Sequence, residues 1–183
     1  MGQLYTPTAR AWTIHYMEPR DLAQVFRITQ KTTPRWVRRD LVCDFLSTDT
    51  FSWVAEAGGQ LAGFLVCRVV ALRGRAAVRR RGPRSSREGP RRFELVHIAV
   101  APEYQRGGVG KSLMARLEEL LARPDDCVQA AVPESNLAVQ LFLRSLGYKA
   151  VRVLRGYYGA ENGYAMVWRR AWGATAGPLS PSE

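Results

Sequence analysis

The residues best suited to chemistry lie in a glycine-rich turn within IAVAPEYQRGGVGKSL, residues 98–113. An apolar, strand-like run leads into the turn, and an amphipathic helical pattern follows it. Backbone N–H groups at a helix start lack intrahelical acceptors, the helix dipole adds partial positive charge, and glycines let an anion approach the main chain. The turn holds three glycines and two basic residues: Arg106, Gly107, Gly108, Gly110 and Lys111. It is therefore predicted to bind a phosphate group.

Two common phosphate motifs do not fit this turn. A Walker A loop ending in the G-K-S at 110–112 would need glycine where the chain has Gln105. A Rossmann G-x-G-x-x-G starting at Gly108 would need glycine where the chain has Leu113. The pattern that remains is Q-x-x-G-x-G, from Gln105 to Gly110.

That pattern resembles the pyrophosphate loop of the GNAT acyltransferases, which bind acetyl-coenzyme A at a strand-to-helix turn. The stretches ELVHIAVAPEYQRGGVGKSLMARLEELL and PESNLAVQLFLRSLGYKAVRVLRGYY extend the likeness on both sides of the loop. The order S-N, L-G-Y, G-Y-Y and Y-A-M is similar to the RimI type and to archaeal and eukaryotic N-terminal acetyltransferases. Together these features cover most of residues 12–170.

The resemblance implies an α/β (α+β) GNAT fold, with a mixed, mostly antiparallel central sheet flanked by about four helices. We expect a single domain over residues 1–170 and a flexible tail over 171–183. The activity implied is direct transfer of an acetyl group from acetyl-coenzyme A to a primary amine within a ternary complex. A protein or peptide N-terminus is the leading acceptor.

The resemblance also assigns cofactor-binding residues along the strand, the turn and a later helix. The main chain ending at Val100 would run beside the pantetheine arm, and an N–H there would polarise the thioester carbonyl. The turn would hold the pyrophosphate, and Asn136 would hydrogen-bond the coenzyme. The complete set is Ile98, Ala99, Val100, Gln105, Arg106, Gly107, Gly108, Val109, Gly110, Lys111 and Asn136.

The groups that would move protons depart from the RimI pattern. An ungapped count from Asn136 puts Leu143 at the usual tyrosine and Ala131 at the usual glutamate. Glu94 is the best substitute base, because it lies in the strand that feeds the turn and matches the base of the histone-acetylating branch. Alternation places Glu94 on the face of Val96 and Ile98, where partial burial would raise its pKa. The alternative is a structural carboxylate facing Arg91 or Arg92.

The other candidate site residues are a histidine and three aromatic residues. His97 is out of phase with Glu94 and is expected to pack on the opposite sheet face. The resemblance assigns substrate contacts to Tyr157 and Tyr158, which could instead be paired strand aromatics. Trp36 is a further substrate-binding candidate, in the segment between the first two helices.

Hydrophobic periodicity supplies the elements that must position these groups. Helices are expected over residues 19–30, 37–46 and 109–121, and another from a cap at Ser135 to Gly147; strands are expected over 51–57, 61–72, 93–100, 127–132, 148–158 and 163–170. The Gly58-Gly59 pair predicts a hairpin between the first two strands.

The charge is localised. Of the formal net charge of +11, the stretch 73–92 carries +8, because it holds nine arginines against the single Glu88. Its Gly, Pro and Ser content predicts a long loop. The loop is either a solvated insertion or an electrostatic arm for RNA, the ribosome or an acidic peptide.

Composition also bears on metal binding, membrane binding and cellular location. Cys43, Cys67 and Cys127 lie in apolar sequence and are expected to be buried free thiols, with no metal site. No apolar run approaches the roughly 18 residues that span a bilayer. We therefore expect a soluble, cytoplasmic protein, a monomer or homodimer that does not bind membranes.

Two other functions remain open at this point. One is acetylation of a small-molecule amine. The other is a degenerate GNAT module that binds acetyl-coenzyme A and contacts RNA or the ribosome through the arginine-rich loop, which the absent tyrosine and glutamate favour.

Overall fold

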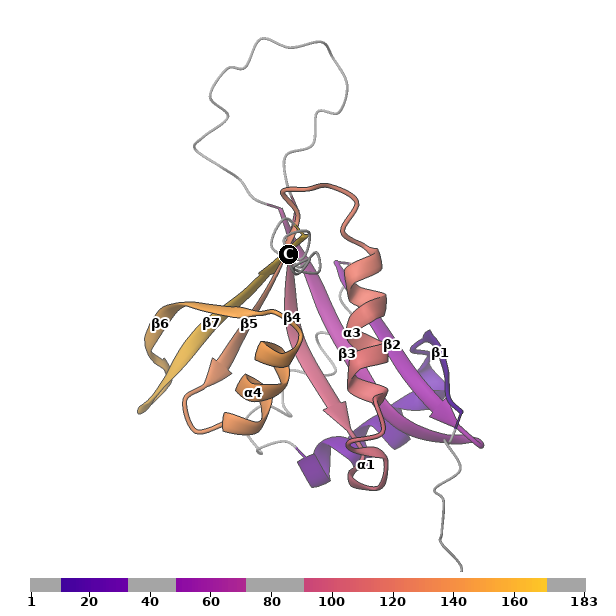
Figure 1. The fold of residues 1–183 in the computed structure, drawn as a ribbon. Coiled ribbons are helices and arrows are strands. Elements are labelled where there is room, and N and C mark those ends of the chain that lie inside the picture. Colours follow the sequence, from indigo (N-terminus) through magenta and orange to yellow (C-terminus); the bar gives the residue numbers. More distant parts are fainter. Residues whose placement is uncertain (1–10, 33–48, 72–90, 171–183) are drawn as a thin grey trace, which may run out of the picture. The chain divides into compact units, whose positions relative to one another are not determined.

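The computed structural model describes residues 11–32, 49–71 and 91–170 (Figure 1). The described residues form seven strands: β1 (Thr13–Tyr16), β2 (Thr50–Ala57), β3 (Gln60–Ala71), β4 (Arg91–Val100), β5 (Cys127–Pro133), β6 (Lys149–Tyr158) and β7 (Glu161–Arg169). The α-helices are α1 (Leu22–Thr32), α3 (Val109–Glu119) and α4 (Leu137–Ser145), and short 3₁₀ turns η1 (Pro19–Asp21) and η3 (Pro102–Tyr104) precede α1 and α3.

The strands are hydrogen-bonded in the order β1-β2-β3-β4-β5-β7-β6. β4 and β5 pair in parallel, whereas β1 with β2, β5 with β7, and β6 with β7 are antiparallel. The parallel pair is joined through α3, as such a pair requires a crossover connection. The expected α/β architecture with a mixed, mostly antiparallel sheet is confirmed.

Most expected elements agree with the structure to within a few residues. The structure adds the short strand β1, which the sequence analysis did not predict. The expected helix over 37–46, most of the basic stretch 73–92 and the tail after residue 170 lie outside the described residues. The expectation of a single domain stays a prediction.

The chain forms two compact units, and β3 and β4 each contribute to both. Unit 1 comprises residues 1–67 and 97–117. In it Gln24 of α1 accepts a hydrogen bond from the Leu61 N–H of β3, at 3.0 Å. Its buried core comes from α1, β2, β3 and α3 and includes Val25, Ile28, Val54, Phe64, Leu65, Leu113, Met114 and Leu117.

The β2–β3 connection is the hairpin that Gly58-Gly59 predicts. Both glycines have positive φ, 58° and 78°, which a two-residue turn of this type requires at both central positions.

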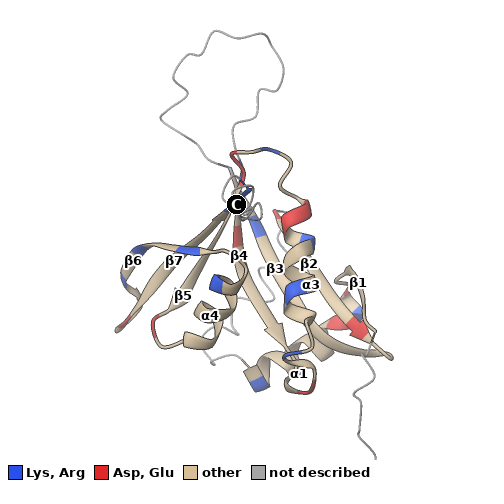
Figure 2. Ribbon diagram, viewed as in Figure 1, with Lys and Arg blue, Asp and Glu red and all other residues tan. Residues whose placement is uncertain are grey.

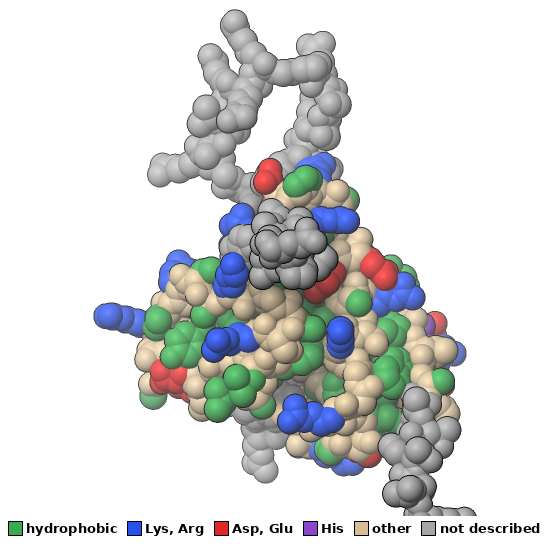
Figure 3. Space-filling view, in the orientation of Figure 1, with side chains coloured by type: hydrophobic (Ala, Val, Ile, Leu, Met, Phe, Trp, Pro, Cys, Tyr) green, Lys and Arg blue, Asp and Glu red, His purple; other side chains and the backbone are tan. Residues whose placement is uncertain are grey.

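Unit 2 comprises residues 68–96 and 118–183, with β5, β7, β6 and α4. Its buried side chains include Phe93, Leu95, Val128, Ala130, Val132, Leu143 and Met166. Figure 3 shows apolar side chains, with basic ones among them, at the surface over α4 and β6. Those exposed apolar residues include Leu137, Leu141, Val151 and Val153.

A buried carboxylate ties the start of β4 to the turn before β5. Asp126 is fully buried and accepts hydrogen bonds from the N–H of Arg91 at 2.8 Å and the N–H of Arg123 at 3.1 Å. The Arg91 guanidinium lies 3.3 Å from the same carboxylate. Burial alone would raise the pKa of Asp126, but these hydrogen bonds and the charge of Arg91 hold the pKa below its ordinary value.

Asp126→Asn should lower the free energy of unfolding at neutral pH by about 2 kcal/mol, because it breaks a buried, charge-assisted network. A lowered folded-state pKa contributes stability above the ordinary value of 3.8, and that stability is lost as the pH falls through the folded-state pKa. Urea unfolding should therefore show wild type and variant converging in acid. The neighbouring, exposed Asp125 gives the control: a pH-independent difference, or an equal loss in Asp125→Asn, would contradict this role.

Candidate active site

The glycine turn joins β4 to α3 in unit 1. After η3 the chain bends at Arg106, with φ of 64°, and at Gly108, with φ of +95°. The N–H of Gly107 donates to the carbonyl of Tyr104 at 3.4 Å. A side chain at position 107 would place its Cβ 3.3 Å from that same oxygen, so glycine keeps the turn tight.

The turn presents a row of open amides. The first helical hydrogen bond of α3 runs from the N–H of Ser112 to the carbonyl of Gly108, at 3.0 Å. Within the described part of the chain, the N–H groups of Val109, Gly110 and Lys111 have no acceptor. They are therefore available to an anion at the positive end of the helix dipole.

The charges around α3 favour an anion at the same end. The first turn of the helix contains no acidic residue, and Arg106 and Lys111 flank it. Glu118 and Glu119 lie at the other end of α3, and Figure 2 shows acidic colouring there. Because no acidic residue in the first turn neutralises the positive end of the helix dipole, the helix start keeps its attraction for negative charge.

The turn is braced from three sides within unit 1. The Gln105 side chain donates to the Val100 carbonyl at 3.1 Å. A Cβ at Gly63 of β3 would lie 2.8 Å from the Ala99 carbonyl, so glycine permits the close approach of β3 to β4 there. The Trp12 ring lies 3.7 Å from the position of a Cβ on Gly108. The sequence analysis missed Gly63 and Trp12, because both act through partners distant in sequence.

Glu94 lies on the half-exposed face of β4 in unit 2. The burial pattern of β4 alternates: Phe93, Leu95 and His97 are buried, whereas Glu94 and Val96 are partly exposed. The predicted alternation is confirmed, including the placement of His97 opposite Glu94.

The ion-pair partner expected for Glu94 is corrected by the structure. Among the described residues its ion-pair partner is Arg68 of β3, with Nη1 3.9 Å from the carboxylate, and the Glu94 side chain keeps 34% of its exposure. Arg91 instead contacts Asp126, and Arg92 donates to Gln129 at 3.5 Å.

Asn136 is the N-cap of α4. Its side-chain oxygen accepts from the N–H of Val139 at 3.2 Å, so the expectation that Ser135 caps this helix is wrong. The Ser135 N–H instead donates to Glu161 at 2.7 Å. Capping uses the oxygen of the Asn136 amide and leaves its NH₂ group as a donor for a ligand.

The two tyrosines end β6. Tyr157 is 54% exposed, whereas Tyr158 is partly buried and donates its hydroxyl proton to the Ala131 carbonyl at 2.8 Å. Leu143, at the position of the usual tyrosine, is completely buried and acts as a core residue. Trp36 lies outside the described residues.

The model of the acetyltransferase (GNAT) family matches residues 16–148. The chain belongs to this family. The match includes β4, the glycine turn, α3, β5 and α4, and therefore the whole region whose geometry favours an anion.

Relatives and solved structures agree with the GNAT assignment. The [ribosomal protein bS18]-alanine N-acetyltransferase of Escherichia coli K12 is 37% identical over 70 residues, which are 38% of this chain and 47% of that protein. The chain thus spans about half the length of the curated relatives it matches. The crystal structure of the E. coli ribosomal-protein-S18-alanine N-acetyltransferase has a TM-score of 0.67 at 24% identity, covering 87% of this chain and 94% of that one. Arabidopsis thaliana NAA60 in complex with acetyl-CoA has a TM-score of 0.66 at 19% identity, covering 87% and 99%. These two likenesses show the GNAT fold.

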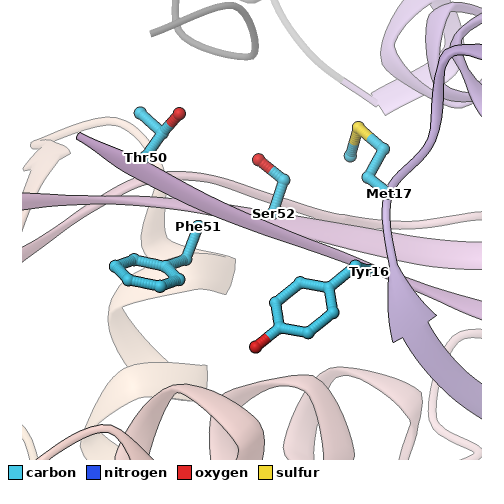
Figure 4. A pocket seen from close by; sticks show the side chains of 5 residues that line it. All are labelled: Tyr16, Met17, Thr50, Phe51 and Ser52. Carbon is cyan, nitrogen blue, oxygen red and sulfur yellow. The ribbon is translucent and has the colours of Figure 1, made fainter. Parts of the chain in front are cut away.

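Two surface hollows in the described part of the chain are lined by residues other than the predicted GNAT site residues. One, of about 290 Å³, is lined by Tyr16, Met17, Thr50, Phe51 and Ser52, with Tyr16 and Phe51 pointing to one side of the strands (Figure 4). The other is lined by Ala11, Ala57, Gly58, Gln60 and Tyr104. Neither contains a residue predicted to bind coenzyme or substrate.

Over residues 11–32, 49–71 and 91–170, no group of three or more His, Cys, Asp or Glu side chains could hold a metal ion. No helix in this part of the chain has the length and apolar character that a membrane span needs.

The thiols of Cys67 and Cys127 are buried, as predicted, whereas Cys43 lies outside the described residues. Burial raises the pKa of Cys67 to about 12 and also raises the pKa of Cys127. Neither thiol is therefore a nucleophile at neutral pH.

In a Cys43→Ser variant, a chromogenic disulfide reagent at mildly alkaline pH should react with the folded protein at least about 100-fold more slowly than with the urea-unfolded chain, because burial suppresses both access and thiolate. The absorbance of the released thiolate measures the rate. Similar rates in the folded and unfolded chains would contradict the burial of these thiols.

Proposed function

We propose that the protein is an acetyl-coenzyme A-dependent N-acetyltransferase that acts on a primary amine, with a protein or peptide N-terminus as acceptor. The open amide row of the glycine turn carries the proposal, because it lies within the matched family region and suits a pyrophosphate. Support for the acceptor comes from the named alanine N-acetyltransferase relatives.

The residues of the turn fit the coenzyme. The amides of Val109, Gly110 and Lys111 would bind the pyrophosphate, with Arg106 and Lys111 supplying charge. Gly107 and Gly108 leave the main chain accessible. The chain from Ile98 to Val100 would lie along the pantetheine arm, and the free NH₂ of Asn136 would donate to the coenzyme.

Bound acetyl-coenzyme A supplies the acetyl thioester, and the protein supplies position and a route for the proton. An amine attacks only in its neutral form, so an ammonium acceptor must first lose a proton. Glu94 would accept that proton, directly or through a water. Its half-exposed position on β4 leaves the carboxylate accessible to an acceptor.

A panel of acceptors tests the function. The protein is incubated with acetyl-coenzyme A and a peptide with a free N-terminal alanine, the same peptide with a blocked N-terminus, and a polyamine, and thiol release is followed. Release with the free peptide alone supports the proposal. Release with the polyamine alone would favour the small-molecule reading, and coenzyme binding without any release would favour the degenerate module. The same panel with RNA added tests contact through the basic stretch at 73–92. This contact and the cytoplasmic location both stay predictions.

Gly108→Ala should weaken coenzyme A binding at least about tenfold, because a residue with a Cβ at φ of +95° costs about 1–2 kcal/mol and distorts the amide row. Calorimetry measures the affinity. Gly59→Ala is the matched control, since Gly59 has φ of +78° in the same unit and no atom within 4 Å of its Cβ position. It should lower the melting temperature comparably and leave coenzyme affinity unchanged, and an equal loss of affinity would contradict the assignment.

Glu94→Gln should lower kcat at least about tenfold without changing coenzyme affinity, because proton removal by a positioned base contributes roughly 10² or more. Its pH–rate profile should shift toward the pKa of the acceptor amine. Arg68→Gln is the control, since it breaks the same ion pair but keeps the carboxylate. If both variants lose activity equally, or the profile is unaltered in Glu94→Gln, Glu94 has only a structural role.

A further inference from the structure

The two adjacent tyrosines at the end of β6 have different environments. β6 is an outer strand, and Leu154 and Tyr158 are its partly buried residues, whereas the other eight are exposed. The rings of Tyr157 and Tyr158 meet edge to face, with centroids 5.0 Å apart and an interplanar angle of 81°. Tyr157 is therefore exposed to solvent, and its ring packs against the ring of Tyr158.

Tyr158 spans three strands of unit 2. It belongs to β6, the neighbouring strand is β7, and its hydroxyl reaches the Ala131 carbonyl of β5. Ala131 directly follows the last recorded pair of β4 with β5, Leu95 with Ala130. The tyrosine hydroxyl thus satisfies a β5 carbonyl at the point where pairing with β4 has ended.

Gly163 of β7 makes this crossing possible. A Cβ at Gly163 would lie 2.9 Å from Cε2 of Tyr158, closer than real contacts allow. Gly163 pairs with Pro133, which lies on the same face of β5 as Ala131 and Gln129. Gln129 in turn pairs with Glu94, so the Tyr158 ring lies on the face of the sheet that carries Glu94.

The Tyr158 hydroxyl keeps the proton that it donates to the Ala131 carbonyl. Burial, followed by the charges of Tyr157, Glu161 and Glu94, raises the pKa of Tyr158 to about 12. Tyr158 therefore remains a donor throughout the physiological pH range.

We propose that Tyr158 is a positioning residue that fastens the end of β6 to β5, and that Tyr157, held edge-on by Tyr158, is the tyrosine that contacts the acceptor. This inference rests on the proposed function and departs from the expectation that both tyrosines contact substrate. Tyr158 then affects acceptor binding through Tyr157.

A double-mutant cycle tests this coupling. Tyr157→Ala and Tyr158→Phe should each raise the acceptor KM about fivefold, with coenzyme affinity unchanged and kcat within about twofold. Because Tyr158 acts through Tyr157, the double variant should have the KM of Tyr157→Ala alone. A KM raised about 25-fold in the double variant, the product expected of independent contacts, would overturn the proposal. An unchanged KM in Tyr158→Phe would also overturn it.

A second variant covers the case in which Tyr158→Phe does not fold. Gly163→Ala keeps the hydroxyl but displaces the ring, so it should raise the acceptor KM in wild type and not in the Tyr157→Ala background. Gly159→Ala, in the turn of the same hairpin, has no atom within 4 Å of its Cβ position but strains the backbone at φ of +77°, so it controls for disturbance of the hairpin backbone without a clash against the ring. Equal effects of the two glycine substitutions would contradict the role of the ring.

The contact can also be measured without substrate. The Tyr158 hydroxyl proton should exchange slowly with solvent in the NMR spectrum, and its signal should be absent in Tyr158→Phe. If this signal is present and no peptide is acetylated, the proposed function fails and the contact stands. If the signal is missing, the positioning role is wrong whatever the activity.

Discussion

The candidate site depends on the strict alternation of β4. One face of the strand is buried, with Phe93, Leu95 and His97, and the other presents Glu94 and Val96 at partial exposure. A register shift of one residue would bury the carboxylate and expose the core side chains, so burial of the apolar face fixes the direction in which Glu94 points. The same strand continues to Val100, where Gln105 braces the start of the glycine turn. One hydrophobic constraint therefore positions a charged group and the turn that we propose binds an anion.

The local elements could be predicted from the sequence because their causes are local. Two adjacent glycines, Gly58 and Gly59, are enough to indicate a hairpin. The glycines of the turn before α3, followed directly by a helical pattern, are enough to indicate backbone amides without intrahelical acceptors. Alternation in β4 placed Glu94 and His97 on opposite faces. In each case, the residues that determine the structure are near neighbours in sequence.

The remaining features could not be predicted, because distant residues determine them. β1 has four residues, too few for a periodic pattern, and pairing with β2 stabilises it. Arg68 pairs with Glu94 from another strand, where the sequence suggested neighbouring arginines. The cap of α4 lies at Asn136 rather than Ser135, a difference between adjacent residues that both have capping side chains. Two glycines, Gly63 and Gly163, carry no local signal of the close approaches they permit.

The environment of Ala131 connects one departure from the RimI pattern with the Tyr158 contact. In the ungapped count a glutamate usually occupies this position, and its side chain would point to the sheet face that the Tyr158 ring covers. Alanine at 131 and glycine at 163 both keep that face clear, so the tyrosine can cross β7 and reach the β5 carbonyl. The small side chain at position 131 and the tyrosine contact are therefore sterically linked. Glu94 is the acidic side chain of β4 and β5 on that face, which supports the proposal that it accepts the proton.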